Sequence, residues 1–294
     1  MEHLLDSRRG RRFKGNLHLH TTRSDGALMP EQAVAWYRQR GYDFTAITDH
    51  YVVTDVSKLS TPGFLTVRGY EMSADRTDLG QSFHLVALGI DEAVTYDNPR
   101  AIKAQVIIDE LNQKGGTVFL AHPYWSGLTA TDMLPLQGVI GLEAFNTGCG
   151  TDLGKALSTV HWDDVLARGK RWWGLATDDA HWRDDDAGGG WVMVEADALA
   201  EDAIIAALRV GRFYSSSGPD IYELSLDGST LSVRCSPVSA INFIGLTQWG
   251  AQNRAADGDP LTEASYRLRG VERYVRVECI DAQGRKAWSN PIYL

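Results

Sequence analysis

Residues 29–50 read MPEQAVAWYRQRGYDFTAITDH and predict one helix followed by one strand. Pro30 suits the first turn of a helix, where its missing N–H costs nothing, and Gly41 ends the helix. The short apolar run Phe44–Ile47 is typical of a buried strand. Thr48-Asp49-His50 follows directly, so this unit delivers polar side chains to the end of a buried strand.

The same alternation of helix and strand continues over residues 13–220. Asn98-Pro99 begins a second helix that Gly115-Gly116 ends, and Thr117–Ala121 follows as a strand. A further helix is expected over Ala196–Val210. Amphipathic helices that alternate with short apolar strands predict an α/β barrel around a parallel sheet.

Residues 221–294 show a different pattern, in which apolar and polar residues alternate, as in Ile221–Leu226. This period of two is typical of half-buried antiparallel strands. Asp227-Gly228 and Asp281–Gly284 are hairpin-turn signals. We therefore predict two domains: a barrel over residues 1–220 and a small antiparallel β-sandwich module over residues 221–294.

The composition limits the classes of function. The chain has 294 residues, 44% of them hydrophobic, and its 29 basic and 38 acidic side chains give a formal net charge of −9. An acidic chain without an extended basic region is not expected to bind nucleic acid or anionic membranes nonspecifically. No apolar run approaches the roughly 20 residues of a membrane span, and Met1–Lys14 lacks a secretory signal, so a cytoplasmic location is expected.

Three further features of the sequence are expected to be structural. Cys149, Cys235 and Cys279 are odd in number and scattered, which favours free thiols over disulfides or a zinc knuckle. The basic run Arg8–Arg12 is interpreted as a solvated leader before the first strand, with an anion-binding arm as the alternative. Asp184–Gly190, with three acids and three glycines, is expected to form a mobile loop.

Residue types that bind metals recur at the expected strand ends. His18 and His20 are two residues apart, so their side chains lie on one face of an extended segment. In a barrel the carboxyl ends of the strands converge on one rim, so side chains far apart in the chain are expected to be neighbours. The candidate metal ligands are His18, His20, Asp25, His50, Glu71, His84, His122, Asp179 and His181.

Taken singly, these residues also have structural interpretations. Asp25 suits an Asx turn, His84 suits an apolar strand, and the others can cap helices or bond to the backbone. Five independent strand ends with the same residue types make metal binding the better interpretation. Imidazole and carboxylate ligands suit zinc, manganese or iron, and nine side chains suffice for more than one ion, with Glu71 able to bridge.

In this order the motifs resemble the PHP superfamily, named for polymerase and histidinol phosphatase. The resemblance covers residues 13–220 and rests on His18–His20, Ser24–Gly26, Thr48–His50, Gly69–Glu71, Ala121–Pro123 and Asp179–His181. It implies a distorted (β/α)7 TIM-like barrel that holds a centre of two or three divalent metal ions.

The resemblance also implies how the ligands are shared among the ions. The first ion would be held by His18, His20, Glu71 and Asp179, the second by Glu71, His84 and His122, and the third by Asp25, His50 and His181. Glu71 and a hydroxide would bridge the first two ions. Some members of the family have histidine at the position of Asp25, and this departure bears on the third ion.

The C-terminal part resembles one subgroup of that family. Arg209–Pro219, the β module and Trp288–Pro291 are similar to the subgroup typified by carbaryl hydrolase. There the resemblance implies cleavage of a carbamate or carboxylic ester by a metal-bound hydroxide. Phosphoryl and acyl chemistry therefore both stay open.

The motifs also suggest catalytic roles. Two ions about 3.5–4 Å apart can activate a shared water molecule for attack on an ester. Arg183 is the first candidate to hold the phosphoryl oxygens, with Arg23 and Arg68 as alternatives. His50 or His181 can pass a proton to the leaving group where it is not fully committed to metal.

Other residues near the expected rim have supporting roles. Asp49 is expected to orient a ligand histidine, a role that we favour over a direct catalytic one. Trp125, Trp182 and Trp191 either stack on an aromatic or nucleoside-like substrate or pack in the rim, and packing is the favoured interpretation.

Three functions are compatible with this sequence. The favoured one is a phosphoesterase that cleaves a small-molecule phosphate mono- or diester with a metal-bridging hydroxide. The alternative is a metal-dependent carboxylester or carbamate hydrolase, which fits the C-terminal resemblance and the lack of an Arg/Lys cluster beside the ligand motifs. A non-catalytic module held by metal is less favoured, because structural zinc sites are usually closed clusters of four ligands.

Overall fold

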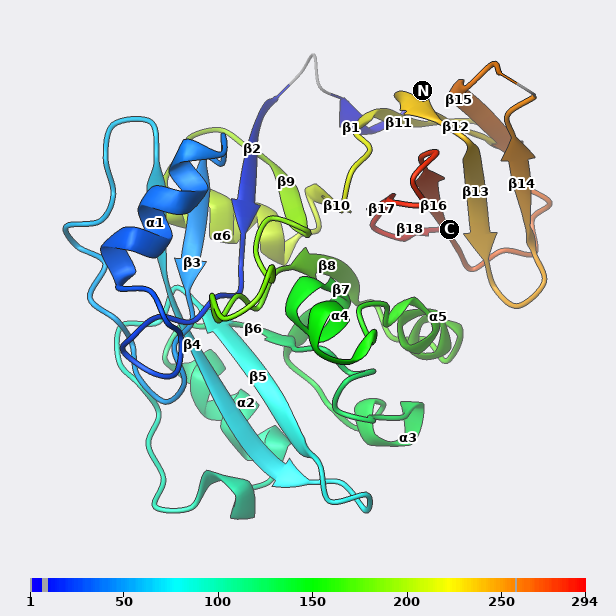
Figure 1. Ribbon diagram of the computed structural model, residues 1–294. Coiled ribbons are helices and arrows are strands. Elements are labelled where there is room, and N and C mark those ends of the chain that lie inside the picture. The colour runs from blue at the N-terminus through cyan, green and yellow to red at the C-terminus, as the bar shows by residue number, and fades with distance from the viewer. Residues whose placement is uncertain (1, 7–9, 257) are drawn as a thin grey trace.

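Strands dominate the computed structural model of the chain, which describes residues 2–6, 10–256 and 258–294. The helices lie around one half of the molecule, and strands β11–β18 gather on the other side (Figure 1). The helical elements are α1 (Pro30–Gln39), η1 (Pro99–Ala101), α2 (Ala104–Gln113), α3 (Ala130–Met133), α4 (Thr147–Leu153), α5 (Thr159–Ala167) and α6 (Glu201–Arg209). None of these helices is long and apolar enough to cross a membrane.

The strands of the N-terminal three quarters of the chain belong to one large sheet, in which β2 to β8 lie in sequence order and β9 and β10 lie beyond β2. They are β2 (Arg11–Asn16), β3 (Phe44–Ile47), β4 (Leu65–Arg76), β5 (Ser82–Leu88), β6 (Thr117–Leu120), β7 (Val139–Asn146), β8 (Trp173–Thr177), β9 (Trp191–Ala196) and β10 (Phe213–Ser216). Their order in the sheet is β10-β9-β2-β3-β4-β5-β6-β7-β8.

The sheet is mixed, so the expectation of a purely parallel barrel sheet is wrong. Strands β2, β3 and β4 are parallel to one another, as are β6, β7 and β8. Between the two sets, β5 runs antiparallel to both of its neighbours, because a tight hairpin joins it to β4. The hydrogen-bonded path ends at β8, and a single parallel bridge from Leu19 to Ala180 links the segments that follow β2 and β8.

The local elements agree with the sequence where turn signals are strong. Helix α1 begins at Pro30, and β3 spans Phe44–Ile47 as expected. The helix expected from Asn98-Pro99 is instead a short 3-10 turn followed by α2, because Asp75 accepts a hydrogen bond from the N–H of Ala104 at 2.7 Å. The carboxylate of a neighbouring strand therefore sets the start of this helix.

The helix expected over Ala196–Val210 begins later than predicted. Ala196 is the last residue of β9, where it pairs with Arg11 of β2, and α6 starts at Glu201. Gly211 follows the helix with a φ of 74°, as a helix-ending glycine should. The strand pairing with β2 thus overrides the helical pattern at its N-terminal end.

The C-terminal strands form two facing layers. They are β11 (Ile221–Asp227), β12 (Thr230–Val238), β13 (Ala240–Gly245), β14 (Gly250–Arg254), β15 (Leu261–Arg267), β16 (Tyr274–Ile280), β17 (Lys286–Ser289) and β18 (Ile292–Tyr293). One layer is a separate sheet of order β1-β11-β12-β15, and the other extends the large sheet through β17 and β10. Their buried apolar side chains share one core, which includes Leu5, Leu224 and Val277.

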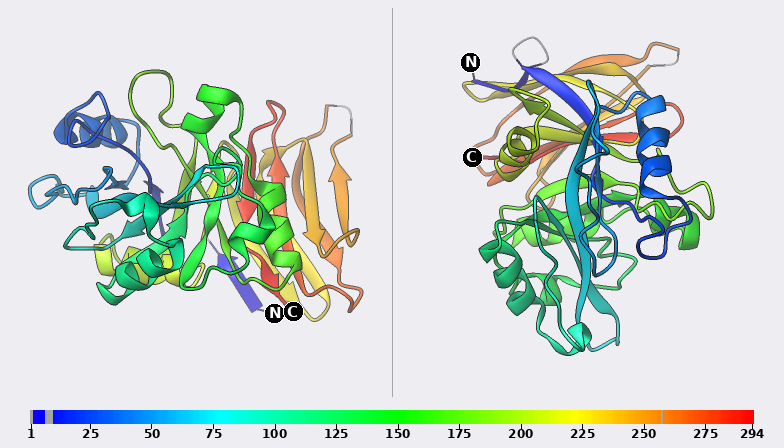
Figure 2. Two further views of the ribbon diagram at one scale, coloured as in Figure 1. Left: turned by 90° about the horizontal axis from the view of Figure 1, so that it is seen from below. Right: turned by 90° about the vertical axis from the view of Figure 1, so that its left-hand side faces the viewer.

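The N-terminal segment belongs to these layers. Strand β1 (Glu2–Asp6) pairs with β11, so both ends of the chain lie beside the C-terminal strands (Figure 2). Arg11 and Arg12 are part of β2, and Arg12 donates a hydrogen bond to the carbonyl of Ile221 at 2.5 Å. The prediction of a leader before the first strand is therefore wrong for these two arginines, although Arg11 is exposed as expected, and Arg8 and Arg9 lie outside the described residues.

Candidate metal centre

The residues expected to bind metal converge because two distant segments of the chain are hydrogen-bonded side by side. The N–H of Asp179 donates to the carbonyl of His18 at 2.8 Å, and the N–H of His20 donates to Ala180 at 2.9 Å. Asp179 has a φ of 57° and His122 a φ of 25°, values that non-glycine residues rarely adopt. Such backbone strain gathers at functional sites.

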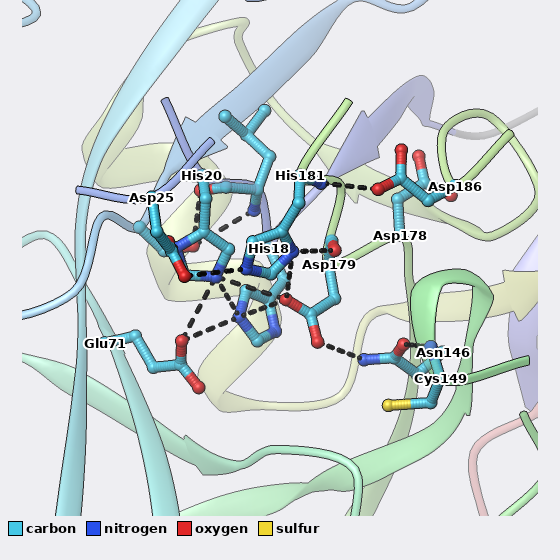
Figure 3. A network of polar contacts seen from close by, with 12 residues as sticks. His18, His20, Asp25, Glu71, Asn146, Cys149, Asp178, Asp179, His181 and Asp186 are labelled. Atoms are coloured by element: carbon cyan, nitrogen blue, oxygen red, sulfur yellow. Dashed lines mark hydrogen bonds and ion pairs between the residues drawn. The ribbon is translucent and has the colours of Figure 1, made fainter. Parts of the chain in front are cut away.

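Four buried side chains form the centre of the cluster (Figure 3). Nε2 of His20 lies 3.1 Å from an oxygen of Glu71 and 3.1 Å from an oxygen of Asp179. Nε2 of His18 lies 3.3 Å from each of the same two oxygens and 3.2 Å from Nε2 of His20. Four ligands about 2.0 Å from a tetrahedral ion are about 3.3 Å apart, so these spacings fit a divalent cation.

Glu71 connects this group to a second one through its other oxygen. Oε1 of Glu71 lies 2.9 Å from Nδ1 of His84 and 3.7 Å from Nε2 of His122. Glu71 was expected at the end of its strand, but β4 continues to Arg76 as the first half of a long hairpin. This extension is what brings His84 of β5 next to Glu71.

A third group lies nearer the solvent. An oxygen of Asp25 lies 3.5 Å from Nε2 of His181 and 3.8 Å from Nε2 of His50, and its other oxygen lies 3.7 Å from Nδ1 of His20. The ring of His20 is stacked between those of His50 and His181, with centroids 4.4 and 4.3 Å away. His20 therefore faces the central group with one nitrogen and the outer group with the other.

The buried carboxylates of the cluster need positive charge beside them. Burial opposes the protonated form of His20, but hydrogen bonds to Asp179 and Glu71 raise its pKa to about 9. Burial likewise disfavours the ionised forms of Glu71 and Asp179, and yet the surrounding histidines lower the pKa of both carboxyls. Buried carboxylates of this kind are stable beside protons or metal ions, so the cluster fits divalent metals.

One buried carboxylate that we did not predict orients the ligands. Oε1 of Glu143 lies 2.7 Å from Nδ1 of His18, which leaves Nε2 of that histidine facing the cluster. Its other oxygen accepts hydrogen bonds from the N–H of His122 and the side chain of Asn146. The amide of Asn146 also donates to Asp179 at 3.2 Å. A lone acid within the apolar strand β7 was the available signal in the sequence.

Asp49 has different partners from those expected. It accepts hydrogen bonds from the N–H and hydroxyl of Thr21 and from the hydroxyls of Ser24 and Thr54. These contacts fix the loop that carries Asp25. We expected Asp49 to orient a ligand histidine. Glu143 instead makes such a contact, with His18.

The glycine-rich loop after His181 is anchored, in contrast to the mobile loop that we expected. Asp178 is fully buried and accepts hydrogen bonds from the N–H groups of Gly188, Gly189 and Gly190, at 2.7, 3.0 and 2.9 Å. Tyr37 donates its hydroxyl to the same carboxylate at 2.7 Å. The loop therefore holds a defined position over the site.

A pocket of about 350 Å³ opens onto the cluster. Of the three arginines considered, Arg183 lines it, and its Nη2 donates to the carbonyl of Asp25 at 2.5 Å. Arg68 instead pairs with Glu201, and the exposed Arg23 is not among the residues that line the pocket. The geometry therefore brings one of the three candidate cations to the site.

The three tryptophans also differ in their surroundings. Trp182 packs against Trp36, with ring centroids 5.4 Å apart, and its Nε1 donates to the carbonyl of His20. Trp191 lies under the ammonium group of Lys14 at 3.8 Å. Trp125 lines the pocket and lies 5.1 Å from the ring of His122.

Comparisons with known proteins add to this geometry. No family model matches the chain. A curated phosphoribosyl 1,2-cyclic phosphate 1,2-diphosphodiesterase of Eggerthella lenta is 32% identical over 81 residues, which cover 26% of this chain and 31% of that protein. The chain therefore matches about a third of the length of this relative.

One solved structure shares the fold, and a second shows a weaker similarity. A protein of Bacteroides vulgatus, described as "a two-domain protein containing predicted PHP-like metal-dependent phosphoesterase", is 16% identical with a TM-score of 0.55. The alignment covers 99% of this chain and 96% of that one. An amidohydrolase of Chromobacterium violaceum with bound sulfate is 18% identical with a TM-score of 0.47, over 68% of this chain and 96% of the other. The chain thus shares the mixed α/β fold of the first structure along almost its whole length.

Proposed function

We propose that the protein is a metal-dependent phosphoesterase that acts on a small-molecule phosphate mono- or diester. The observation that carries the proposal is the convergence of His18, His20, Glu71 and Asp179 at 3.1–3.3 Å at the base of a pocket. Its fold relative and its partial sequence match, both described as phosphoesterases or phosphodiesterases, support the same chemistry.

The side chains would hold two or three divalent ions of zinc, manganese or iron. The central group is His18, His20, Glu71 and Asp179, the second is Glu71, His84 and His122, and the outer one is Asp25, His50 and His181 with His20 beside it. Bound ions of this kind lower the pKa of a water molecule and neutralise charge that develops on the ester.

The remaining steps belong to side chains at the pocket. Arg183 would bind a non-bridging phosphoryl oxygen, because it is held at the pocket edge by the Asp25 carbonyl. His181 would give a proton to the leaving oxygen when two ions are present: Asp25 raises its pKa against the effect of burial, and Nδ1 is already bonded to a carbonyl. With a third ion, His50 and His181 would be ligands.

The finer features of the fold are also part of the proposal. We propose that β2–β8 form the distorted seven-stranded barrel, for which the Leu19–Ala180 bridge is the supporting contact. We place the domain boundary between residues 220 and 221. The core shared by β11, β12, β13, β15, β16 and β17 supports a sandwich of these strands, and Leu5 of β1 and Tyr214 of β10 add to it.

A second candidate is a carboxylester or carbamate hydrolase of the carbaryl-hydrolase type. Besides Arg183, the pocket lining includes the carboxylates of Asp152, Asp184 and Asp186. This balance of charge favours esters with little negative charge, which is the observation on which the alternative rests.

A panel of substrates distinguishes the two candidates. Purified protein loaded with zinc or manganese is assayed with p-nitrophenyl phosphate, bis-p-nitrophenyl phosphate and p-nitrophenyl acetate, with its metal content measured in parallel. We expect turnover of at least one phosphate ester, lost on chelation and regained on addition of metal. Turnover of the acetate alone would overturn the proposal in favour of the acyl hydrolase.

Variants of the cluster serve as the matched test. His20→Ala and Glu71→Ala should lose metal and lower phosphoesterase activity at least about a hundredfold, since each removes a ligand of the central group. His161→Ala is the control, because that histidine contacts Tyr124 outside the cluster. Full metal content and activity in the ligand variants would show that the ligand assignment is wrong.

A further inference from the structure

Two chemically different groups of residues line the pocket. Arg183 lies beside Asp25 of the outer ligand group, and Trp125 lies beside His84 and His122 of the second group. A volume of about 350 Å³ exceeds by far the roughly 30 Å³ of one water molecule, so the pocket has room for an organic group beside a phosphoryl group. Trp125 is therefore the candidate residue for recognition of the organic group.

Packing does not account for Trp125. Its indole is partly exposed and belongs to none of the hydrophobic clusters formed by the described residues, whereas Trp182 and Trp191 both pack against one of them. The ring stands nearly perpendicular to that of His122, with an interplanar angle of 79°. A large apolar ring at the edge of a polar pocket suggests that a ligand covers it.

The indole is also held in a fixed orientation. Its Nε1 donates to Asp152 at 3.0 Å, and Asp152 belongs to α4. The N-cap of α4 is Asn146, which donates to the ligand Asp179. Trp125 is thus connected to the cluster in two ways: through His122, three residues before it, and through Asp152 of α4. A ring fixed in this way loses little entropy when a ligand stacks on it.

The charge around the indole limits what it can bind. Asp152 places a carboxylate at the edge of Trp125, and Asp184 and Asp186 add negative charge elsewhere on the pocket wall. A second phosphate or a carboxylate on the organic group would be repelled there. A planar, uncharged ring avoids this repulsion.

We propose that Trp125, positioned by Asp152, is the specificity-determining residue that selects esters whose organic group is a planar, non-anionic ring. This inference rests on the proposed phosphoesterase function and adds the class of substrate. The phosphoryl group would lie toward Arg183 and the ring against the indole. Asp152 is a positioning residue, since it acts through the orientation of Trp125.

The direct test compares two ligands that differ in the ring alone. Binding of phenylphosphonate and methylphosphonate to the metal-loaded protein is measured by calorimetry, which requires no turnover. We expect phenylphosphonate to bind about tenfold more tightly, as a stacking contact allows. Trp125→Ala should remove this preference and leave the affinity for methylphosphonate and the metal content unchanged.

Variants of Asp152 test the positioning role. Asp152→Ala should lose part of the preference for the ring, and Asp152→Asn should restore it because the amide oxygen still accepts the Nε1–H bond. Asp152→Asn should also improve binding of 4-carboxyphenylphosphonate, since it removes the repelling charge. Trp249→Phe, in the turn between β13 and β14, is the control and should behave as wild type.

The outcomes separate this inference from the proposed function. If wild type hydrolyses phosphate esters but shows no preference for phenylphosphonate, or if Trp125→Ala keeps the preference, the role of Trp125 is wrong and the phosphoesterase stands. If neither phosphonate binds and the acetate alone is hydrolysed, the proposed function fails and this inference fails with it. With bis-p-nitrophenyl phosphate, Trp125→Ala should raise KM about tenfold and change kcat less.

Discussion

Glu143 acts on the cluster chiefly through the ring of His18. Its 2.7 Å contact with Nδ1 of His18 fixes which nitrogen of that ring faces the other ligands. Glu143 is fully buried in β7, where it also accepts from the N–H of His122 and the amide of Asn146. Metal affinity should therefore depend on a residue that offers no ligand atom to the three groups.

We predict that Glu143→Ala weakens metal binding by about 10–100-fold, the usual effect of removing a group that orients a ligand histidine. Glu143→Gln should lose less, because the amide oxygen can still accept from Nδ1. Competition with a coloured chelator measures both affinities. Glu92→Gln, at an exposed position, is the control. Unchanged affinity in Glu143→Ala would show that His18 is oriented by other contacts.

The protonation of His20 predicts how stability depends on pH when metal is removed. Its pKa is about 9 in the folded chain against about 6.5 when unfolded, so the folded state binds the proton more tightly. This contribution is fully present below pH 6.5 and is lost as the pH rises through 9. The chelated protein should therefore lose stability between pH 6.5 and 9.5.

Urea unfolding across that range measures the effect in wild type and in His20→Asn. The variant should lose less stability with rising pH, since it lacks the titrating group. Saturating metal should remove the loss in wild type, because metal takes the place of the proton. A stability that is equally flat or equally steep in both chelated proteins would contradict the assigned cause.

The sequence predicted the residues of the cluster better than the residues that support it. All nine candidate ligands lie in the three groups. They could be predicted because histidines and acids recur at the expected strand ends, which can be located in the sequence. The roles of Glu143 and Asp178 were not predicted: Glu143 is a lone acid within an apolar strand, and Asp178 lies directly before the candidate ligand Asp179. Their roles depend on backbone N–H groups and rings that only the folded chain brings together.

At the scale of elements, the loop over the site depends on one carboxylate. Asp178 accepts three backbone N–H groups of residues 188–190 and the hydroxyls of Tyr37 and Thr147. Burial raises its pKa, and these donors act in the opposite direction. The loop that carries Arg183 is thereby fixed to the end of β8.

Asp178→Ala should lower the free energy of unfolding by about 3 kcal/mol, because it leaves buried N–H groups without an acceptor. Hydrogen exchange at residues 188–190 should become faster in the variant. Asp184→Ala, an exposed change in the same loop, is the control and should stay within about 0.5 kcal/mol of wild type. Equal exchange rates in the two variants would mean that Asp178 does not anchor the loop.

The elements that were predicted well are those with strong local signals. Pro30 and Gly41 bracket α1, and β3 has the predicted bounds. The predicted starts of α2 and α6 were wrong, because contacts with β4 and β2 decide them. Local propensity is overridden at the points where an element meets a strand from elsewhere in the chain.

At the scale of the molecule, an ion pair between a buried arginine and a partly exposed aspartate links the C-terminal strands to α5. Arg276 of β16 donates two hydrogen bonds of 2.7 Å to Asp163 of α5 and lies over the ring of Trp162. The guanidinium group is fully buried, so its charge depends on this partner. This ion pair therefore joins the C-terminal strands to the helical part of the chain.

Arg276→Ala should destabilise the protein by about 2–4 kcal/mol, because it removes the contact with Trp162 and leaves Asp163 and Glu278 without this cation. Arg276→Met should cost less, since it keeps apolar contact with Trp162. Arg234→Ala, which breaks an exposed pair in β12, is the control and should cost less than about 1 kcal/mol. Thermal unfolding measures all three, and equal shifts for Arg276→Ala and Arg234→Ala would contradict the linking role.

The arrangement of the sheet was the hardest feature to predict. Alternation of helices and strands indicated a mixed α/β molecule, but it did not reveal that β5 is antiparallel or that β1 pairs with β11. Both pairings join segments by contacts that the alternating pattern does not encode. The meeting of residues 18–20 with residues 179–181 was predicted, because it follows from strand ends at a common rim.

Anomalous X-ray diffraction from crystals grown with zinc or manganese tests the central claim most directly. We expect anomalous peaks about 2.0–2.3 Å from the ligand atoms of His18, His20, Glu71 and Asp179, and a further peak between Glu71, His84 and His122. Peaks elsewhere, with none between His20 and Asp179, would contradict a metal centre at this site and the hydrolysis that we assign to it.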